Sequence, residues 1–400
     1  MKLTDICDFQ GGSQPPKEEW SFDKQDGYVR MLQIRDFTQS ERVTPEYIKI
    51  SNSTKVCEAD DILIARYGAS IGKILTGLAG AYNVAIMRTI PDTSKIKKKY
   101  LYYYLKSSYF QNAIINVGSR AAQAGFNKED LSKLDIECPK LVEQEGVINI
   151  LEKIEAVIEK QKEELTSLDD LIKARFVEMF GTLDNPAQKF EKATLKELCN
   201  KITDGKHGGC TSEEGTKRYF VGAREIYNDE VHYDTAPEIN VDEFEKDYKR
   251  CNIEIGDFLI VNTGATIGKS AIASDERTEH TLLQKSVALL KVKQELLNPM
   301  FLKWCYRVNT RMYMVESASA QPNLLLSKIN ATEIYVPDMK LQNQFADFVH
   351  QVNKSKFVER FPELSLFYRL FSPLNSEMIC IFPYFCPYAE SAREIRGIFS

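Results

Sequence analysis

The chain has 400 residues, of which 43% are apolar and 27% are charged, and its formal net charge is −5. These values exclude a mainly disordered chain, and the length exceeds what one small core requires, so we expect two or three domains. No run approaches the roughly 18 consecutive apolar residues of a membrane-spanning helix, and the first residues lack the basic and apolar regions of a secretory leader. We therefore expect a cytoplasmic protein that does not enter a membrane.

The charge is distributed unevenly along the chain. Residues 1–140 carry a net charge of +3, residues 141–182 carry −5, and the remainder carries −3. The acidity that would oppose binding to nucleic acid is thus concentrated in one segment. The nine cysteines include no Cys-x-x-Cys pair and the four histidines are widely separated, so we expect reduced thiols and no metal site.

Residues 1–140 predict a first domain of mixed α+β structure. An apolar run at 61–65 has the length of a strand, and a Gly-Ala-Ser-Ile-Gly-Lys loop follows it and ends at Lys73. Four lysines within 95–99 precede a helical pattern at 100–105. They could form a basic patch for phosphate, but we favour the solvated start of a helix whose aromatic face lies in the core.

A heptad pattern predicts a long helix within 141–182. Apolar residues recur at spacings of four and three over about 33 residues, which is typical of a coiled coil. One small domain cannot cover such a seam, so we expect antiparallel pairing with a second helix. The positions of the seam are Val147, Leu151, Ile154, Ile158, Gln161, Leu165, Leu168, Ile172, Arg175 and Met179.

The second domain, at 183–340, repeats the first. Residues 257–269 match residues 61–73 at a constant offset of 196, with the aspartate, both glycines and the lysine in register. Strand-length runs at 258–261 and 286–292 and a helical pattern at 300–306 complete the copy. We therefore predict an α+β protein of two tandem, similar domains separated by a long heptad helix.

The end of the chain departs from this repeat. Gln344 is expected to correspond to Gln144, so that residues 341–357 begin a second long helix. Four prolines then forbid its continuation, and residues 358–400 form a divergent, aromatic-rich tail. A truncated partner would leave Leu165, Leu168 and Ile172 of the first helix exposed or self-associating.

No catalytic motif is complete. The glycine loops have three residues between their glycines, whereas a nucleotide-binding P-loop has four. Lys73 and Lys269 could contact phosphate or simply face solvent beside a tight turn. The segment 184–187 lacks the second proline and the aromatic residue of an adenine-methylating Asn-Pro-Pro-aromatic motif, and the Asp-Met-Lys sequence at 338–340 has no correctly spaced counterpart in the first copy. Catalysis by this chain is therefore not expected.

Together, the doubled domain, the doubled glycine loop and the heptad helix resemble the specificity subunit of Type I restriction-modification systems, over about residues 1–357. The resemblance implies two target recognition domains, each reading half of a bipartite double-stranded DNA sequence. It also implies helices that dock methyltransferase subunits, with restriction subunits completing the complex. The chain itself would be non-catalytic and hold no cofactor, because S-adenosylmethionine, ATP and magnesium belong to the partner subunits.

Candidate DNA-contacting residues lie in the glycine loops and in two small-residue loops at 119–125 and 317–323. Arg, Gln and Asn can make bidentate contacts to base edges, although capping of their own loops is equally plausible for the amides. The candidates are Arg66, Tyr67, Lys73, Arg120 and Gln123 in the first domain, and Asn262, Lys269, Gln321 and Asn323 in the second.

Two alternatives remain open. The chain could be a silent or phase-variable specificity cassette, or a free-standing DNA-binding protein, that does not assemble with methyltransferase subunits. A fused methyltransferase is a further possibility, which the missing cofactor and methylation motifs oppose. Neither the DNA target nor the spacing of its halves follows from the sequence.

Overall fold

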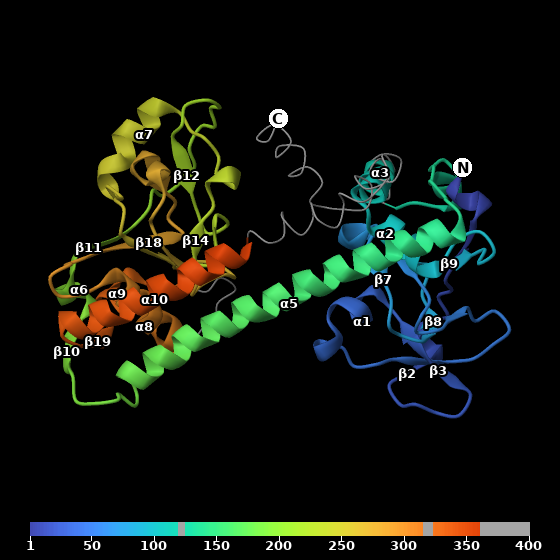
Figure 1. The fold of residues 1–400 in the computed structure, drawn as a ribbon, viewed down its shortest axis with the longest axis horizontal. Coiled ribbons are helices and arrows are strands. Elements are labelled where there is room, and N and C mark those ends of the chain that lie inside the picture. Colours follow the sequence, from blue (N-terminus) through green and yellow to red (C-terminus); the bar gives the residue numbers. More distant parts are fainter. Residues whose placement is uncertain (119–124, 315–322, 361–400) are drawn as a thin grey trace. The chain divides into compact units, whose positions relative to one another are not determined.

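The computed structural model describes residues 1–118, 125–314 and 323–360 and divides them into two compact units. Unit 1 comprises residues 1–160 and unit 2 comprises residues 161–360 (Figure 1). Each unit combines helices with antiparallel and parallel strands, so the predicted α+β class is confirmed.

Unit 1 contains two sheets. The first has the order β1-β9-β6-β7 and is antiparallel, and the second has the order β2-β4-β3-β8-β5, in which β3 and β8 are parallel. The strands are β1 (Cys7–Gly11), β2 (Trp20–Ser21), β3 (Tyr28–Leu32), β4 (Tyr47–Lys49), β5 (Val56–Cys57), β6 (Leu63–Ala65), β7 (Ile74–Leu75), β8 (Gly80–Tyr82) and β9 (Ile86–Pro91). The short helices are α1 (Ile34–Thr38), α2 (Lys98–Lys106), α3 (Ser108–Gly118) and α4 (Lys128–Leu131).

Unit 2 repeats this plan. Its antiparallel sheet β11-β18-β15-β16 has the topology of β1-β9-β6-β7, and the parallel pair β12-β17 matches β3-β8. The strands are β10 (Glu191–Thr194), β11 (Cys199–Asp204), β12 (Tyr219–Val221), β13 (Ile226–Tyr227), β14 (Glu230–Val231), β15 (Phe258–Val261), β16 (Ser270–Ile272), β17 (Thr281–Leu283), β18 (Val287–Val292) and β19 (Glu333–Val336). The helices besides the two longest are α6 (Leu195–Leu198), α7 (Val241–Asp247), α8 (Pro299–Val308) and α9 (Leu326–Ala331).

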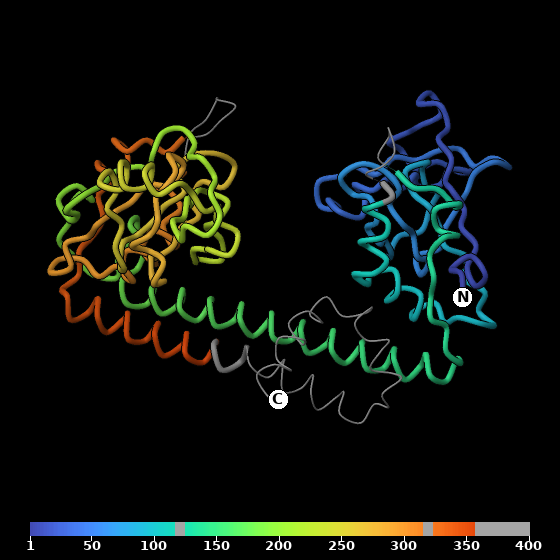
Figure 2. Tube along the Cα trace, turned by 90° about the horizontal axis from the view of Figure 1, so that it is seen from above, coloured from blue at the N-terminus to red at the C-terminus, as the bar shows by residue number. Residues whose placement is uncertain are grey.

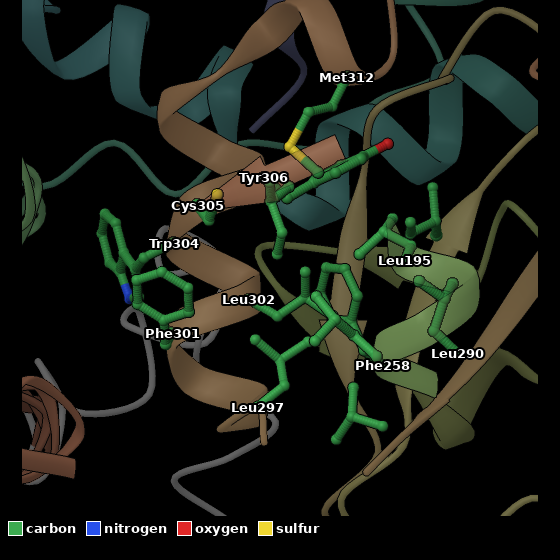
Figure 3. Packing of buried hydrophobic residues seen from close by; sticks show 14 of the residues in the cluster. Leu195, Phe258, Leu290, Leu297, Phe301, Leu302, Trp304, Cys305, Tyr306 and Met312 are labelled. Atoms are coloured by element: carbon green, nitrogen blue, oxygen red, sulfur yellow. The ribbon is translucent and has the colours of Figure 1, made fainter. Parts of the chain in front are cut away.

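The inner strands β6 and β15 of the antiparallel sheets are buried on both faces. In β15, Phe258 and Ile260 pack into the core that contains α8, and Figure 3 shows Phe258 there among residues of α8. Leu259 and Val261 pack into a second core with β12 and β17. The strand β6 divides its side chains in the same way. Burial on both sides explains why these segments read as continuous apolar runs without alternation.

The long helix predicted between the domains is α5 (Leu141–Phe180), and α10 (Met339–Arg360) is its partner in unit 2. Within that unit Phe176 contacts Phe345, with ring centroids 5.3 Å apart, and Asp169 pairs with Lys356 at 2.6 Å. The residue numbers of these contacts increase along α5 and decrease along α10, so the two helices are antiparallel, as expected (Figure 2). Ile172 is fully buried and Leu168 packs on the same core, so the expectation that these two would be left exposed or self-associating is wrong. Leu165, the third residue of that expectation, is half-buried.

The seam of α5 shifts by one residue near its end. Ile172, Phe176 and Phe180 are fully buried, whereas the predicted positions Arg175 and Met179 are only half-buried. Spacings of four keep one face of a straight helix against a globular core, because an α-helix has 3.6 residues per turn. The heptad spacing therefore holds as far as Ile172, inside the core of unit 2, and gives way to spacings of four after it. The other predicted seam residues are buried (Val147, Leu151) or half-buried (Ile154, Ile158, Gln161, Leu165).

The start of α10 also differs from the expected register. Gln342, not Gln344, is the counterpart of Gln144, since both are fully buried and make the same set of hydrogen bonds. Gln344 is exposed. The predicted divergent tail lies outside the described residues from 361 onward.

Candidate nucleic-acid interface

Each glycine loop connects two antiparallel strands as a hairpin. Gly68 and Gly72 have φ values of 69° and 81°, and Gly264 and Gly268 both have 98°. This left-handed conformation is one that glycine adopts without strain. Lys73 and Lys269 close the hairpins through their carbonyl oxygens, which accept hydrogen bonds from Ala65 N at 2.9 Å and Val261 N at 2.8 Å. Their side chains are exposed. The tight strand-to-strand turn is thus confirmed, with the lysine left open to a phosphate.

In unit 1, the glycine loop meets three other segments at the ends of the strands. Tyr67 forms a β-bridge with Gly125, and the Arg66 guanidinium donates to the carbonyls of Phe126 (3.3 Å) and Val84 (3.4 Å). Residues 12 and 13 join this cluster by donating backbone hydrogen bonds to Ile86 O and Tyr82 O, both at 3.1 Å. We call residues 11–13, 66–67, 83–86 and 125–126 the strand-end platform of unit 1.

Unit 2 builds the same platform from different side chains. Thr263 bridges Asn323, and the carbonyl of Asn262 accepts from Leu324 N at 2.7 Å. Gly205 N donates to Val287 O at 3.1 Å, as Gly12 does to Ile86 in unit 1. Residues 205–207, 262–263, 284–287 and 323–324 form the strand-end platform of unit 2. The two units therefore share one backbone arrangement of the platform, while the exposed side chains on it differ.

Glycine permits the closest approach in both platforms. A Cβ atom at Gly12 would lie 2.2 Å from Asn83 O, and one at Gly205 would lie 2.1 Å from Leu283 O. No larger residue can bring the first segment so close to the adjacent loop. Sequence reasoning missed these segments and the loops at 83–86 and 284–287, although the glycine after each first strand was a usable signal.

The predicted DNA-contacting residues divide into two groups on this platform. Arg66 is half-buried and clamps neighbouring loops, and Asn262 is only 4% exposed, so both are placed to position the platform. Tyr67 is 39% exposed and Asn323 is exposed, so both can face a ligand. Lys73 and Lys269 are exposed and are the last residues of the same hairpin loops, directly before β7 and β16. Arg120, Gln123 and Gln321 lie outside the described residues, in segments that end at Gly125 and Asn323.

The lysines at 95–99 are neutralised by carboxylates. Tyr100, Tyr103 and Tyr104 of the helix that follows are buried, which confirms the favoured interpretation of this segment as the start of a helix with an aromatic face in the core. Two of these ion pairs attach the start of α2 to α5, so these lysines help to hold the helix in place. The pairs are Lys95–Asp92, Lys97–Glu145, Lys98–Asp60, Lys98–Asp61 and Lys99–Glu152.

The first platform segment of unit 2 is anchored electrostatically. Lys206 pairs with Asp247 at 2.8 Å and Glu243 at 3.3 Å, and the Asp247 and Glu243 carboxylates raise the pKa of Lys206. The Thr211 hydroxyl and amide lower the pKa of Glu243 to about 2. The charge of Lys206 is thereby neutralised within the protein, while the side chain of the next residue, His207, is exposed.

Among the described residues, no group of three or more His, Cys, Asp and Glu side chains is arranged to hold a metal ion. The seven cysteines in the described part of the chain are free thiols. No described helix is long and apolar enough to cross a membrane.

Two units with one topology and one platform define a protein built as a tandem structural repeat. A family model for the Type I restriction modification DNA specificity domain matches residues 1–167 and 187–359, so the chain belongs to this family of sequence-specific DNA recognition proteins. No curated protein matches the chain.

One solved structure shares this fold at low sequence identity. A chain from a study of complex assembly and conformational transition of the type I R-M system is 15% identical, with a TM-score of 0.52, covering 92% of this chain and 94% of that one. The type I restriction-modification S subunit from M. genitalium is 16% identical, with a TM-score of 0.46 and 93% of each chain covered.

Proposed function

We propose that the chain is the sequence-reading subunit of a Type I restriction-modification complex and that each unit reads one half of a bipartite double-stranded DNA target. The observation that carries this proposal is the duplicated strand-end platform, which keeps its backbone and varies its exposed side chains. Such a division suits two related sites that contact chemically similar DNA while reading different bases. Membership of the DNA specificity family supports it.

The helices α5 and α10 are proposed to dock methyltransferase subunits. The segment 141–182 carries the most negative net charge of the chain, −5, so its surface is better suited to a protein partner than to phosphate. We expect the length of α5 to determine the spacing between the two half-sites, as spacing between linked recognition modules does in other DNA-binding proteins.

In this proposal the chain is non-catalytic and cytoplasmic. Adenine methylation with S-adenosylmethionine and ATP- and magnesium-dependent cleavage belong to the methyltransferase and restriction subunits. Lys73 and Lys269 would supply phosphate contacts, because both are exposed and form no ion pair with any described residue.

The test is co-expression of the full chain with the methyltransferase subunit of its own genome in a host without competing methylation. Size-exclusion chromatography with light scattering should give an assembly of two methyltransferase subunits per chain, and methylome sequencing should give one bipartite motif. A stable assembly that methylates no bipartite sequence would overturn the proposal. A chain that does not assemble would favour the silent cassette or free-standing DNA-binding protein.

A further inference from the structure

One platform loop has the same construction in both units and presents a single outward side chain. It joins β8 to β9 at residues 83–85 and β17 to β18 at residues 284–286. The central residue is Val84, which is 44% exposed, in unit 1 and Lys285, which is exposed, in unit 2. Their neighbours on both sides are at least half-buried.

In unit 1, hydrogen bonds fix the backbone around Val84. Asn83 N donates to Leu32 O at 3.2 Å, and the Asn83 side chain accepts from Ala85 N at 3.1 Å. Arg66 then holds the loop from the other side, with its amide donating to Ala85 O at 2.8 Å and its guanidinium to Val84 O. The isopropyl group of Val84 is left outside this network.

In unit 2, the backbone around Lys285 is fixed by two bonds that repeat those of unit 1, from Gln284 N and Asn262 N, and by two that differ. Lys285 N donates to Lys206 O at 2.9 Å, Gln284 N to Val221 O at 2.8 Å, and Asn262 N to Ser286 O at 3.0 Å. The Ser286 hydroxyl accepts from Ala223 N at 3.2 Å. Binding groups held by a rigid backbone lose little freedom when they engage a ligand, which favours precise recognition.

The two central side chains differ in chemistry. Lys285 forms no ion pair with any described residue, whereas Lys206 beside it is neutralised by two carboxylates. The ammonium group of Lys285 is therefore available to bind a ligand. Val84 adjoins Tyr67 through the clamp of Arg66, whose guanidinium lies 5.0 Å from the centre of the Tyr67 ring. The outward side chain of the unit 1 loop is therefore an exposed apolar group, which carries no charge and no hydrogen-bonding atom.

We infer that the central residue of this loop is a base-reading position in each unit, with Lys285 donating to the O6 and N7 atoms of a guanine and Val84 contacting the methyl group of a thymine in the major groove. Lysine and guanine, and an apolar group and the thymine methyl, are matched pairs in direct readout. The inference rests on the proposed function and adds the residue, the base and the half-site to it.

The experiment uses the full chain in complex with the methyltransferase subunit and the target found by methylome sequencing. Lys285→Met keeps an unbranched side chain that is one heavy atom shorter and removes its charge, and Lys196→Met is the matched control. Lys196 is exposed in α6, at the opposite end of β11 from the platform. We expect Lys285→Met to weaken binding to the target by about 10-fold and to relax one base position in one half-site only. Lys196→Met should do neither.

Modified bases identify the contact itself. Replacing the recognised guanine by 7-deazaguanine should weaken the wild-type complex but not the Lys285→Met complex, because the lost N7 contact is already absent from the variant. Deoxyuridine in place of thymine should likewise penalise the wild type and not Val84→Ala, in the other half-site. Thermal unfolding of each variant verifies that the unit is folded.

The outcomes separate the inference from the proposed function. A wild-type complex without a bipartite target would remove the proposed function and the inference together. A wild-type complex with such a target, combined with unchanged base preference in Lys285→Met and Val84→Ala, would overturn the inference alone. A loss of affinity that is equal for every sequence would make Lys285 a phosphate contact and would also contradict the inference.

Discussion

Gln342 of α10 is the structural counterpart of Gln144 of α5. Each is fully buried, and each accepts a hydrogen bond from the backbone amide at the start of a helix, from Asn298 N and Lys97 N, both at 2.8 Å. Each also donates to two backbone carbonyls, which for Gln342 are Leu296 O at 3.1 Å and Pro337 O at 2.7 Å. One amide side chain thus attaches a long helix to the domain that precedes it.

Replacement of Gln342 by leucine should therefore destabilise unit 2. The change leaves one amide and two carbonyls in the interior without partners, at a cost of about 3 kcal/mol in the free energy of unfolding. Urea unfolding followed by fluorescence measures it, and a Trp20→Phe background confines the signal to Trp304 in unit 2. Gln344→Leu is the control, because Gln344 is exposed, and it should change stability by under about 0.5 kcal/mol. Equal effects of the two variants would contradict the assigned register.

The C-terminal end of α5 should contribute strongly to the stability of unit 2. The ring centroid of Phe176 lies 5.0 Å from that of Phe180, 5.3 Å from that of Phe345 and 5.6 Å from that of Phe301. Phe176→Ala should cost about 3–5 kcal/mol, because it leaves a cavity among aromatic rings. The adjacent Val177 is 40% exposed, so Val177→Ala should be nearly neutral in the same unfolding experiment. A small effect at Phe176 would mean that α5 is only loosely attached to the unit.

These positions show what sequence patterns can and cannot predict. The tandem repeat, the hairpin glycines and the long helix follow from local periodicity and turn chemistry, and all three are present. The shift of the seam to Phe176 does not follow, because it depends on the core that the helix meets. The platform is also hidden from local patterns, since Gly12 and the loop before Ile86 are brought together only by long-range backbone hydrogen bonds.

The two glycines of each hairpin separate backbone strain from crowding. Gly264 and Gly268 share a φ of 98°, but a Cβ at Gly264 would meet nothing within 4 Å, whereas one at Gly268 would lie 2.6 Å from the Tyr313 ring. Gly264→Ala should cost about 1–2 kcal/mol from strain alone. Gly268→Ala should cost more, because Tyr313, which packs on Tyr306 at 4.7 Å, must move. Equal losses in thermal unfolding would show that the ring yields freely.

The two groups of lysines in unit 1 should differ in their effect on DNA binding. Lys73 is exposed without an ion pair to any described residue, whereas Lys99 pairs with Glu152 at 3.6 Å and lies over the rings of Tyr102 and Tyr103. In the full chain bound to its methyltransferase subunit, Lys73→Met should weaken binding to all DNA sequences. Its plot of log affinity against log salt should be shallower by about 0.9, because one phosphate contact is lost.

Lys99→Met is the matched control for that measurement. It should leave the salt dependence of DNA binding unchanged and instead reduce the stability of the α2–α5 contact by under about 1 kcal/mol, as exposed ion pairs contribute little. Lys269→Met in unit 2 should reproduce the effect of Lys73→Met, because Lys269 occupies the same position in the repeated hairpin. If Lys99→Met lowered the salt dependence while Lys73→Met and Lys269→Met did not, the phosphate-contacting surface would lie along α2 and not at the glycine hairpins.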